Sequence, residues 1–367
     1  MNEHALASLD STVTRLGVAL RANGEAAEAE GVLNPASART RDGRLLLYPR
    51  AVSRGNVSRI ALVEVTGSGD DLTFARHGFV LQPEAQYEVR DAPGGYGCED
   101  PRVTFVPALD LYVMAYTAYG PEGPRIALAI SHDAFEWTRL GLVDFSVPGI
   151  DGDDKDGAFF PEPVLSPKGV PSFAFYHRPM LHLSALDGCS AVPVILDMPP
   201  DKRECTRIAY VPLEAALRDP RNLLKVGESA LVLAPEAAWG SIKTGAGTPP
   251  VRVAEGWFSL FHGVDGRFAE DGDCIGMRYS AGIVIHDAQR PHLVRYRSPA
   301  PILVPQTADE LQGVVNEVVF PTALDVRPGS PARTYDVYYG MADSRIGRAR
   351  VELGASAASA DAEESAA

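Results

Sequence analysis

The sequence has few cysteines. Cys98, Cys189, Cys205 and Cys274 are the four in 367 residues, and no two of them form a CxxC pair. This spacing fits neither a structural zinc site nor a dense disulfide framework. We therefore expect free thiols in a reducing compartment, which predicts a cytoplasmic protein. A regularly spaced set of Asp and Glu ligands is also missing, so no metal is predicted.

Long apolar runs are missing as well. No stretch approaches the roughly 18 apolar residues that a membrane-spanning helix needs. The first 20 residues carry acidic side chains early and lack a long apolar core, so they do not resemble a signal peptide. We expect a soluble protein.

Positive charge is in short supply, with 34 Lys and Arg against 48 Asp and Glu and a formal net charge of −14. This balance argues against a general binder of nucleic acids or anionic membranes, because such binding relies on a cationic surface. Basic residues that cluster against this background are therefore informative, since the overall field of the protein opposes an anionic ligand.

Amphipathic helices are scarce in the middle of the chain, where the best candidate is VPLEAALRD at residues 211–219. Short apolar segments rich in β-branched and aromatic residues recur instead, and clusters of Gly, Pro, Asp and Asn separate them. Examples are RLLLYPRAV, SRIALVEV, LYVMAYTAY, RIALAIS, SFAFYH, WFSLFHGV, AGIVIHD and YDVYYGMA. This is an all-β pattern.

Three pairs of segments repeat one form, an aromatic-rich strand, a short turn and a strand with Arg-Ile. They are LLLYPRAV with SRIALVEV, YVMAYTAY with PRIALAIS, and DVYYGMA with SRIGRARV. Such units suit the four-stranded blades of a β-propeller better than a sandwich of two continuous sheets. We expect the propeller over residues 31–353, a short helical extension within residues 1–30, and a disordered acidic tail at residues 354–367.

An unusual acidic motif, GCEDPR at Gly97–Arg102, lies between a glycine-rich turn and a strand. In a strand, Glu99 and Asp100 face opposite ways, so only one of them can enter a given pocket. The other is expected to pair with a neighbouring cation such as Arg102. The alternative for this motif alone is a solvated acidic turn.

Basic residues occur in three further motifs. Lys155 and Asp156 precede an aromatic pair in DKDGAFFPE, although an exposed turn is the alternative there. Arg178 follows His177 at a strand end, where a structural histidine and a surface arginine are the alternative. Lys243 lies among glycines in WGSIKTGAGTPP, where backbone can approach a ligand closely. His262 ends an apolar strand and on its own is typical of a core histidine.

These motifs together match one family in order and spacing. The chain resembles glycoside hydrolase family 130, the β-mannoside phosphorylases and mannosidases, from about Asn34 to Arg350. The resemblance rests on NP at Asn34-Pro35, YPRAV at Tyr48–Val52, SRI at Ser58–Ile60, GCEDPR, GPRIALAIS at Gly123–Ser131, KDGAFFPE at Lys155–Glu162, HRP, WGSIKTGAGTPP, FHGV, NEVVFPT and YYGMAD.

The resemblance implies a five-bladed β-propeller and a set of site residues. The aspartate of the EDPR motif is the general acid, here Asp100, and the family is described as protonating the leaving oxygen through the sugar's own 3-hydroxyl. Phosphate-binding positions correspond to Lys155, Lys243 and His262. Lys155 keeps the charge of the basic residue usual there but lacks the bidentate fork of an arginine. Sugar-binding positions correspond to Arg50, Arg59, Asp156, Arg178 and Asp343.

These roles predict inverting phosphorolysis of β-1,2- or β-1,4-linked manno-oligosaccharides, giving α-mannose 1-phosphate, with inorganic phosphate as co-substrate and no cofactor. Inverting hydrolysis needs a second carboxylate, roughly 6.5–9.5 Å from the acid, to activate water. Phosphorolysis needs instead cations that hold the phosphate dianion. Three basic side chains favour phosphorolysis, while Glu162 and Glu317 are candidate bases for an inverting β-mannosidase acting on the same linkages.

Two other classes are weighed against catalysis. One is a non-catalytic carbohydrate-binding propeller, which has no need of an anion site. The other is an interaction scaffold, whose polar residues would lie on an outer rim. The expected partners are a β-mannoside oligosaccharide and phosphate, without nucleic acid or membrane. The sequence leaves open the linkage, the acceptor sugar and assembly as a homo-oligomer.

Overall fold

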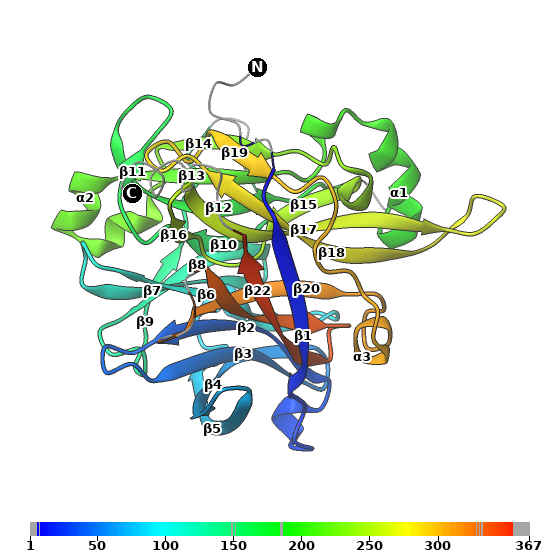
Figure 1. Ribbon diagram of the computed structural model, residues 1–367, viewed down its shortest axis with the longest axis horizontal. Coiled ribbons are helices and arrows are strands. Elements are labelled where there is room, and N and C mark those ends of the chain that lie inside the picture. Colours follow the sequence, from blue (N-terminus) through cyan, green and yellow to red (C-terminus); the bar gives the residue numbers. More distant parts are fainter. Residues whose placement is uncertain are drawn as a thin grey trace, which may run out of the picture.

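The computed structural model describes residues 6–354 except positions 7, 148, 149, 151, 184, 185, 328, 330 and 332. Strands dominate this part of the chain, as the alternating apolar segments predict, and antiparallel pairing prevails among them. The strands fall into five units of four main strands, which we number in chain order (Figure 1).

The first two units share one eight-stranded sheet. Unit 1 contains β2 (Gly31–Arg39), β3 (Leu45–Ser53), β4 (Val57–Ser68) and β5 (Asp71–Leu81). Unit 2 contains β6 (Tyr96–Val106), β7 (Leu111–Gly120), β8 (Gly123–Ser131) and β9 (Thr138–Leu142). A short parallel pairing of Val57 with Tyr96 and Ser58 with Gly97 joins them.

The remaining units are separate sheets. Unit 3 contains β10 (Asp154–Phe159), β12 (Pro171–Pro179), β13 (Thr206–Pro212) and β14 (Glu228–Leu233), with β11 (Val164–Leu165) beside β12. Unit 4 contains β15 (Lys243–Ala246), β17 (Gly256–Phe268), β18 (Cys274–His286) and β19 (Val294–Arg297), with β16 (Val251–Val253) beside β17. Unit 5 contains β20 (Val319–Val326), β21 (Thr334–Met341), β22 (Arg345–Leu353) and β1 (Ser11–Leu20).

Unit 5 combines the two ends of the described chain, because β1 pairs antiparallel with β22 from Ser11–Leu353 to Leu20–Ile346 (Figure 1). The expected helices within residues 1–30 are therefore wrong for residues 11–20. The alternating β-branched residues of β1 favour a strand. The Ala/Glu-rich stretch after β1 forms a single 3₁₀ turn, η1 (Ala26–Glu28). Beyond Gly354, the predicted disordered tail lies outside the described residues.

Helices are short and lie between strands. They are α1 (Gly188–Asp197), α2 (Leu213–Arg218) and α3 (Ala308–Leu311), with 3₁₀ turns η2 (Gln86–Glu88), η3 (Pro200–Lys202), η4 (Pro220–Leu224) and η5 (Ala238–Gly240). The helix predicted in VPLEAALRD is confirmed as α2. Among the described residues, no helix has the length and apolar character needed to cross a membrane.

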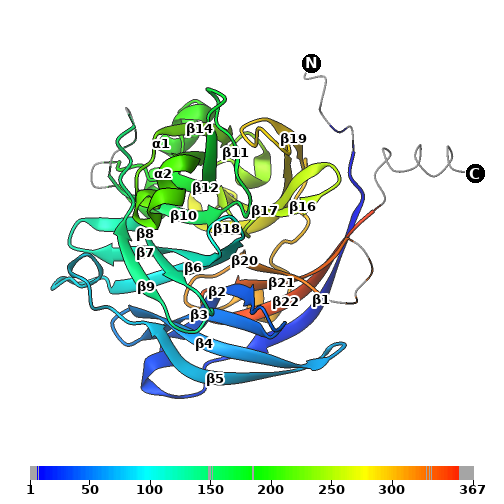
Figure 2. The same cartoon turned by 90° about the vertical axis from the view of Figure 1, so that its left-hand side faces the viewer.

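The hydrophobic core is divided into clusters that lie between neighbouring units. Unit 1 packs on unit 2 through the cluster containing Tyr48 and Met114, and unit 2 on unit 3 through Leu128 and Phe173. Further clusters join unit 3 to unit 4, through Phe160 and Trp257, and unit 4 to unit 5, through Phe258 and Val337. The fifth joins unit 5 back to unit 1, through Tyr338 and Leu47. Each unit thus packs on two others, and Figure 2 shows units 1 and 2 below unit 3 and its helices.

Candidate active site

A cavity of about 200 Å³ is lined by residues from all five units. Eight of the nine predicted site residues line it: Arg50, Asp100, Lys155, Asp156, Arg178, Lys243, His262 and Asp343. The other lining residues are Asn34, Met180, Tyr279, Val315, Val318 and Phe320. Segments up to about 300 positions apart in the sequence therefore meet at one place, as converging inner strands require.

Arg59 is the predicted residue that does not line this cavity. Arg50 donates from Nε to Ser58 Oγ (2.9 Å), so the side chain of Ser58 faces the Arg50 side of the sheet. Successive residues of a strand point to opposite faces. Arg59 follows Ser58 on β4 and donates to Ser53 Oγ (2.9 Å) instead.

Three polar residues of the cavity lie in β-bulges of the first strand of their unit. Asn34, Asp100 and Asp156 have φ values of 41°, 44° and 65°, and the strand register shifts at each of them. Asn and Asp enter this left-handed region more readily than other non-glycine residues. A bulge re-aims a side chain, so the same device directs three polar groups into one cavity.

Asp100 is held by two donors. Its Oδ1 accepts hydrogen bonds from Asn34 Nδ2 (2.9 Å) and Arg50 Nη1 (3.3 Å). Burial raises the pKa of the Asp100 carboxyl, but the charges of Arg50, Arg102 and Lys155 outweigh burial and hold this pKa below its usual value. Asp100 is therefore ionised at neutral pH when the cavity holds no anion.

Asp100 lines the cavity and Glu99 does not, but both carboxylates pair with the guanidinium of Arg50, and the predicted partner Arg102 is wrong. The buried carboxylate of Glu99 pairs with Arg50 Nη2 (2.9 Å) and Lys155 Nζ (3.5 Å). Arg102 instead donates to the backbone oxygens of Gly247 (3.1 Å) and Ala246 (3.1 Å). Arg102 reaches these atoms because the first strands of units 2 and 4 face each other across the centre, which spacing in the sequence does not show.

Asp343 is the second carboxyl group near Asp100. Burial, together with the charges of Asp100 and Glu99, raises the pKa of Asp343 to about 6, although Arg50 and Lys155 oppose the shift. Two neighbouring carboxyls in a low-dielectric site disfavour double ionisation. The pair is thus able to carry a proton close to neutral pH.

Asp156 lies between the basic groups of unit 3 and unit 4. Its Oδ2 is 2.7 Å from Arg178 Nε and 3.8 Å from His262 Nε2, and its Oδ1 is 3.5 Å from Arg102 Nη2. Burial raises the pKa of Asp156, but the charges of Arg178 and Arg102 hold it well below its usual value. Arg178 is buried and also pairs with Glu204, so the surface arginine considered for this motif is excluded.

Asp156→Ala is expected to lower the free energy of unfolding by about 3 kcal/mol, because it leaves two buried guanidinium groups short of a counter-charge. Urea denaturation followed by circular dichroism measures the change. Asp201→Ala is the matched control, since the ion pair of Asp201 with Lys202 is exposed and worth less than about 1 kcal/mol. Equal losses in the two variants would contradict a structural role for the Asp156 carboxylate.

His262 is neutral, not cationic, in this site. Burial lowers the pKa of His262 to about 3, despite the opposing charge of Asp156. Its Nδ1 lies 3.2 Å from the carbonyl oxygen of Ala246, so Nδ1 carries the proton and Nε2 is an acceptor. Gly245 is required beside this ring, because a Cβ there would lie 2.2 Å from His262 Cε1.

Lys243 supplies a positive charge from β15, the strand paired with the His262 strand β17. Its Nζ lies 5.4 Å from the centre of the Tyr279 ring. Burial lowers the pKa of Lys243, but Tyr279 and Glu204 outweigh burial and raise it above the usual value. Lys243 therefore stays protonated in a partly buried position, where a positive charge is worth more to an anion than it is in water.

Neither candidate base for hydrolysis lines the cavity. The side chain of Glu162 is exposed, and Glu317 pairs with Arg267 (3.0 Å). The place of a carboxylate in the sequence does not determine on which side of a sheet it lies.

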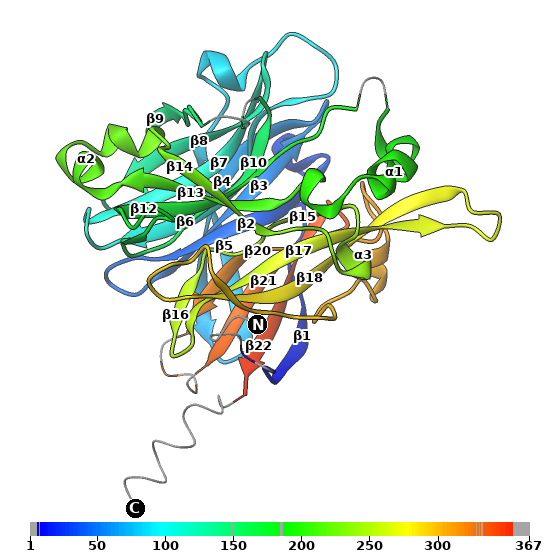
Figure 3. The same ribbon diagram turned by 90° about the horizontal axis from the view of Figure 1, so that it is seen from above.

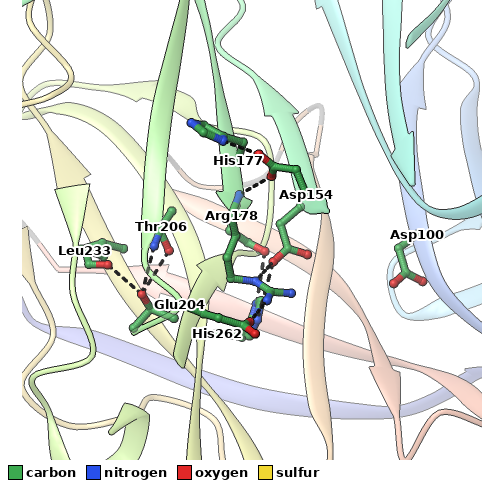
Figure 4. A network of polar contacts seen from close by, with 12 residues as sticks. Asp100, Asp154, His177, Arg178, Glu204, Thr206, Leu233 and His262 are labelled. Atoms are coloured by element: carbon green, nitrogen blue, oxygen red, sulfur yellow. Dashed lines mark hydrogen bonds and ion pairs between the residues drawn. The ribbon is translucent and has the colours of Figure 1, made fainter. Parts of the chain in front are cut away.

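Hydrogen bonds behind the cavity fix β10 against β12 (Figure 4). His177 Nδ1 lies 2.7 Å from Asp154 Oδ2, and Asp154 Oδ1 accepts from the backbone N–H of Arg178 (2.9 Å). His177 Nε2 lies 2.8 Å from Ser229 Oγ on β14. Asp154 directly precedes Lys155 in the chain, so this network holds the backbone that carries the basic residues of unit 3. His177 is thus the structural histidine that was considered for its motif.

A second network supports Lys243 from the adjoining strands (Figure 4). Thr244 Oγ1 donates to the carbonyl oxygen of Leu233 (2.8 Å) and accepts from the backbone N–H of Thr206 (3.2 Å). Thr244 is the next residue after Lys243 on β15, so the strand end is fixed at the point where the lysine enters the cavity.

Several residues line the cavity that the sequence did not indicate as site residues, among them Asn34, Met180, Tyr279 and Phe320. Asn34 carried a signal, since an asparagine before proline inside an apolar segment is typical of a bulge. For the aromatic residues there is no such signal, because an aromatic side chain in a strand is far more often part of the core.

Comparisons with known proteins identify the family of the chain. A family model described as beta-1,4-mannooligosaccharide phosphorylase, that of glycoside hydrolase family 130, matches residues 11–186 and 221–354. The 1,2-beta-oligomannan phosphorylase of Thermoanaerobacter sp. is 27% identical over 75% of this chain and 72% of its own. The beta-1,4-mannooligosaccharide phosphorylase of Ruminococcus albus is 38% identical over 34% of each chain.

A solved structure shows the same fold. The structure of beta-1,2-mannobiose phosphorylase from Listeria innocua, in complex with beta-1,2-mannobiose, superimposes with a TM-score of 0.65. It is 21% identical in sequence and covers 92% of this chain and 96% of its own. Within the described residues, no group of three or more His, Cys, Asp or Glu side chains is placed to hold a metal ion. The chain is a member of glycoside hydrolase family 130, the family of enzymes described as mannooligosaccharide phosphorylases.

Proposed function

We propose that this protein is an inverting phosphorylase of β-1,2- or β-1,4-linked manno-oligosaccharides that produces α-mannose 1-phosphate. One observation carries the proposal: a single cavity collects Asp100 together with Lys155, Lys243 and His262. An acid and an anion site in the same cavity are what phosphorolysis needs, whereas sugar binding alone has no use for buried cations. A scaffold with its polar residues on an outer rim fits this placement poorly.

Asp100 is the general acid of the proposed reaction. In the absence of an anion, Arg50, Arg102 and Lys155 keep the pKa of Asp100 low. Asp100 then has no proton to give at neutral pH, although a general acid must be protonated. A bound phosphate dianion offsets part of that positive charge and so raises the pKa of Asp100. Phosphate binding thereby favours the protonated form of Asp100. The neighbouring Asp343, with its pKa of about 6, can supply the proton. The sugar's 3-hydroxyl carries the proton to the leaving oxygen.

The phosphate is held by Lys155, Lys243 and His262, which have different tasks. The two lysines supply positive charge. His262 supplies an acceptor at Nε2, which suits the single hydroxyl of a hydrogen phosphate ion. Asp156 is not a phosphate ligand in this proposal, because its carboxylate is engaged by Arg178 and Arg102.

Sugar hydroxyls are bound on the other side of the cavity by Asn34, Arg50 and Asp343, with Arg178 and Asp156 closing the site toward unit 4. Arg50 and Asn34 hold Asp100 by Oδ1, which leaves Oδ2 for a substrate hydroxyl. Arg59 does not line the cavity, so it has no role in this arrangement.

The five units are the blades of a five-bladed β-propeller in this proposal. Support comes from the packing of each unit on two neighbours and from the pairing of β1 with β22 within unit 5. Strand β1, from the predicted N-terminal extension, then belongs to the propeller, so the catalytic domain extends from residue 11 to residue 353.

The test is product formation from β-1,2- and β-1,4-mannobiose with and without inorganic phosphate. Phosphorolysis predicts α-mannose 1-phosphate in phosphate buffer and little sugar release without phosphate. Equal release of free mannose in both buffers would instead identify an inverting β-mannosidase. Binding of mannobiose without any turnover would support the non-catalytic alternative. Proton NMR of the first product distinguishes these outcomes and reports the anomeric configuration.

A further inference from the structure

Two of the four cysteines contact each other outside the candidate active site. The Sγ atoms of Cys189 and Cys274 lie 2.6 Å apart. Both side chains are partly exposed, whereas Cys98 and Cys205 are buried. Both thiols of the pair are therefore within reach of a small reagent, and a small shift brings them to the roughly 2.05 Å of a bonded pair.

The contact joins two elements that are distant in the sequence. Cys189 lies in the first turn of α1, and Cys274 is the first residue of β18, where it pairs with Phe268 of β17. Figures 1 and 3 both show α1 beside the long β17–β18 hairpin. Gly266 of β17 permits this approach, since a Cβ there would lie 3.2 Å from Val192 of α1.

The same two elements form a wall of a second cavity, of about 460 Å³. Gly188, Ala191 and Ile195 line it from α1, and Met277 lines it from β18. The second cavity shares two lining residues, Met180 and Lys243, with the cavity of the candidate active site. The cysteine pair does not line this cavity itself, but it joins the two elements, α1 and β18, that do.

We propose that Cys189 and Cys274 form a reversible disulfide that fastens α1 to the β17–β18 hairpin and fixes the wall of the second cavity beside Lys243. The disulfide itself is independent of the proposed function. Its effect on phosphate binding rests on that function.

The reaction is thiol–disulfide exchange with a low-molecular-weight disulfide such as glutathione disulfide. One cysteine thiolate attacks a sulfur of glutathione disulfide, which breaks that S–S bond and releases one glutathione thiolate. The second cysteine thiolate then attacks the protein-bound sulfur of the mixed disulfide and releases the second glutathione. The two cysteines lose two electrons and two protons in total, and both are recovered in two molecules of glutathione.

The experiment exposes the folded protein to glutathione disulfide, blocks remaining thiols with iodoacetamide and maps non-reduced peptides by mass spectrometry. We expect a peptide pair linked through Cys189 and Cys274, a chain lighter by about 2 Da, and reversal by dithiothreitol. Cys98 and Cys205 should be alkylated after unfolding. Alkylated Cys189 and Cys274, glutathione left on either of them, or a bond to Cys98 or Cys205 would overturn the proposal.

The functional arm compares the KM for phosphate of the reduced and oxidised protein. Fixing α1 restricts the movement of the second cavity's wall, and Lys243 lines the same cavity. The KM for phosphate of the oxidised protein should therefore be several-fold higher than that of the reduced protein. Cys274→Ser, checked for folding by circular dichroism, should show no such change. If the disulfide forms and the KM stays the same, the link to Lys243 is wrong. A protein without phosphorolysis still leaves the peptide mapping as a valid test of the disulfide.

Discussion

Replacing Asp100 with asparagine is expected to lower kcat for phosphorolysis by about 10²- to 10⁴-fold, the contribution of a positioned general acid. The amide oxygen still accepts from Asn34, but the side chain has no acidic proton to give. Asparagine also tolerates the φ of 44° found at this position, so the bulge and the fold should persist. Initial rates at saturating mannobiose and phosphate measure the loss, and circular dichroism checks the fold.

Asp110→Asn is a matched control for this variant. Asp110 lies in the turn between β6 and β7, also has a positive φ (56°), and its side chain is exposed beside Arg41. Its replacement should leave kcat unchanged. If Asp100→Asn keeps the kcat of the natural protein, the acid is another group, and Asp343, with its pKa of about 6, becomes the first candidate.

Replacing Lys243 with alanine is expected to raise the KM for phosphate by about 10- to 100-fold, because a buried bond between a cation and an anion is worth about 1.5–3 kcal/mol. The KM for the oligosaccharide should change much less, since Lys243 lies on the side of the cavity away from Asn34 and Arg50. Phosphate titrations at fixed mannobiose give the first constant, and the reverse titrations give the second.

Lys202→Ala provides the comparison for loss of a lysine charge as such. Lys202 is exposed in η3 and pairs with Asp201, so its removal should leave both constants unchanged. An unchanged phosphate KM in Lys243→Ala would remove this residue from the anion site. Equal rises in both KM values would instead indicate a general disturbance of unit 4, in which Lys243 on β15 pairs with Val264 on β17.

Local chemistry in the sequence was enough for the strand class, and the family resemblance supplied the site residues. Alternating apolar segments with turn formers between them predict strands, and the ordered motifs led to eight residues that line one cavity. Residues 11–20 show where this fails. Their neighbours are rich in Ala and Glu, which favour helices, yet pairing with β22 from the far end of the chain makes them a strand.

The ion-pair partners and protonation states of the site residues could not be predicted from the sequence, because both depend on groups brought together from separate units. Glu99 pairs with Arg50 and Lys155, not with the nearby Arg102, whose own partners belong to unit 4. His262 is basic by residue type, but burial makes it neutral and leaves an acceptor at Nε2.

The available chemical groups follow from the sequence alone: one acidic motif, a few basic residues in an acidic chain, and strands to carry them. The tertiary structure decided which groups meet and in what state. Strand alternation leaves Arg59 out and the bulges bring Asp100 and Asp156 in, because the direction of a side chain depends on local backbone geometry. Burial then sets the charges, because the pKa of a group depends on its solvent and its neighbours and not on its residue type alone.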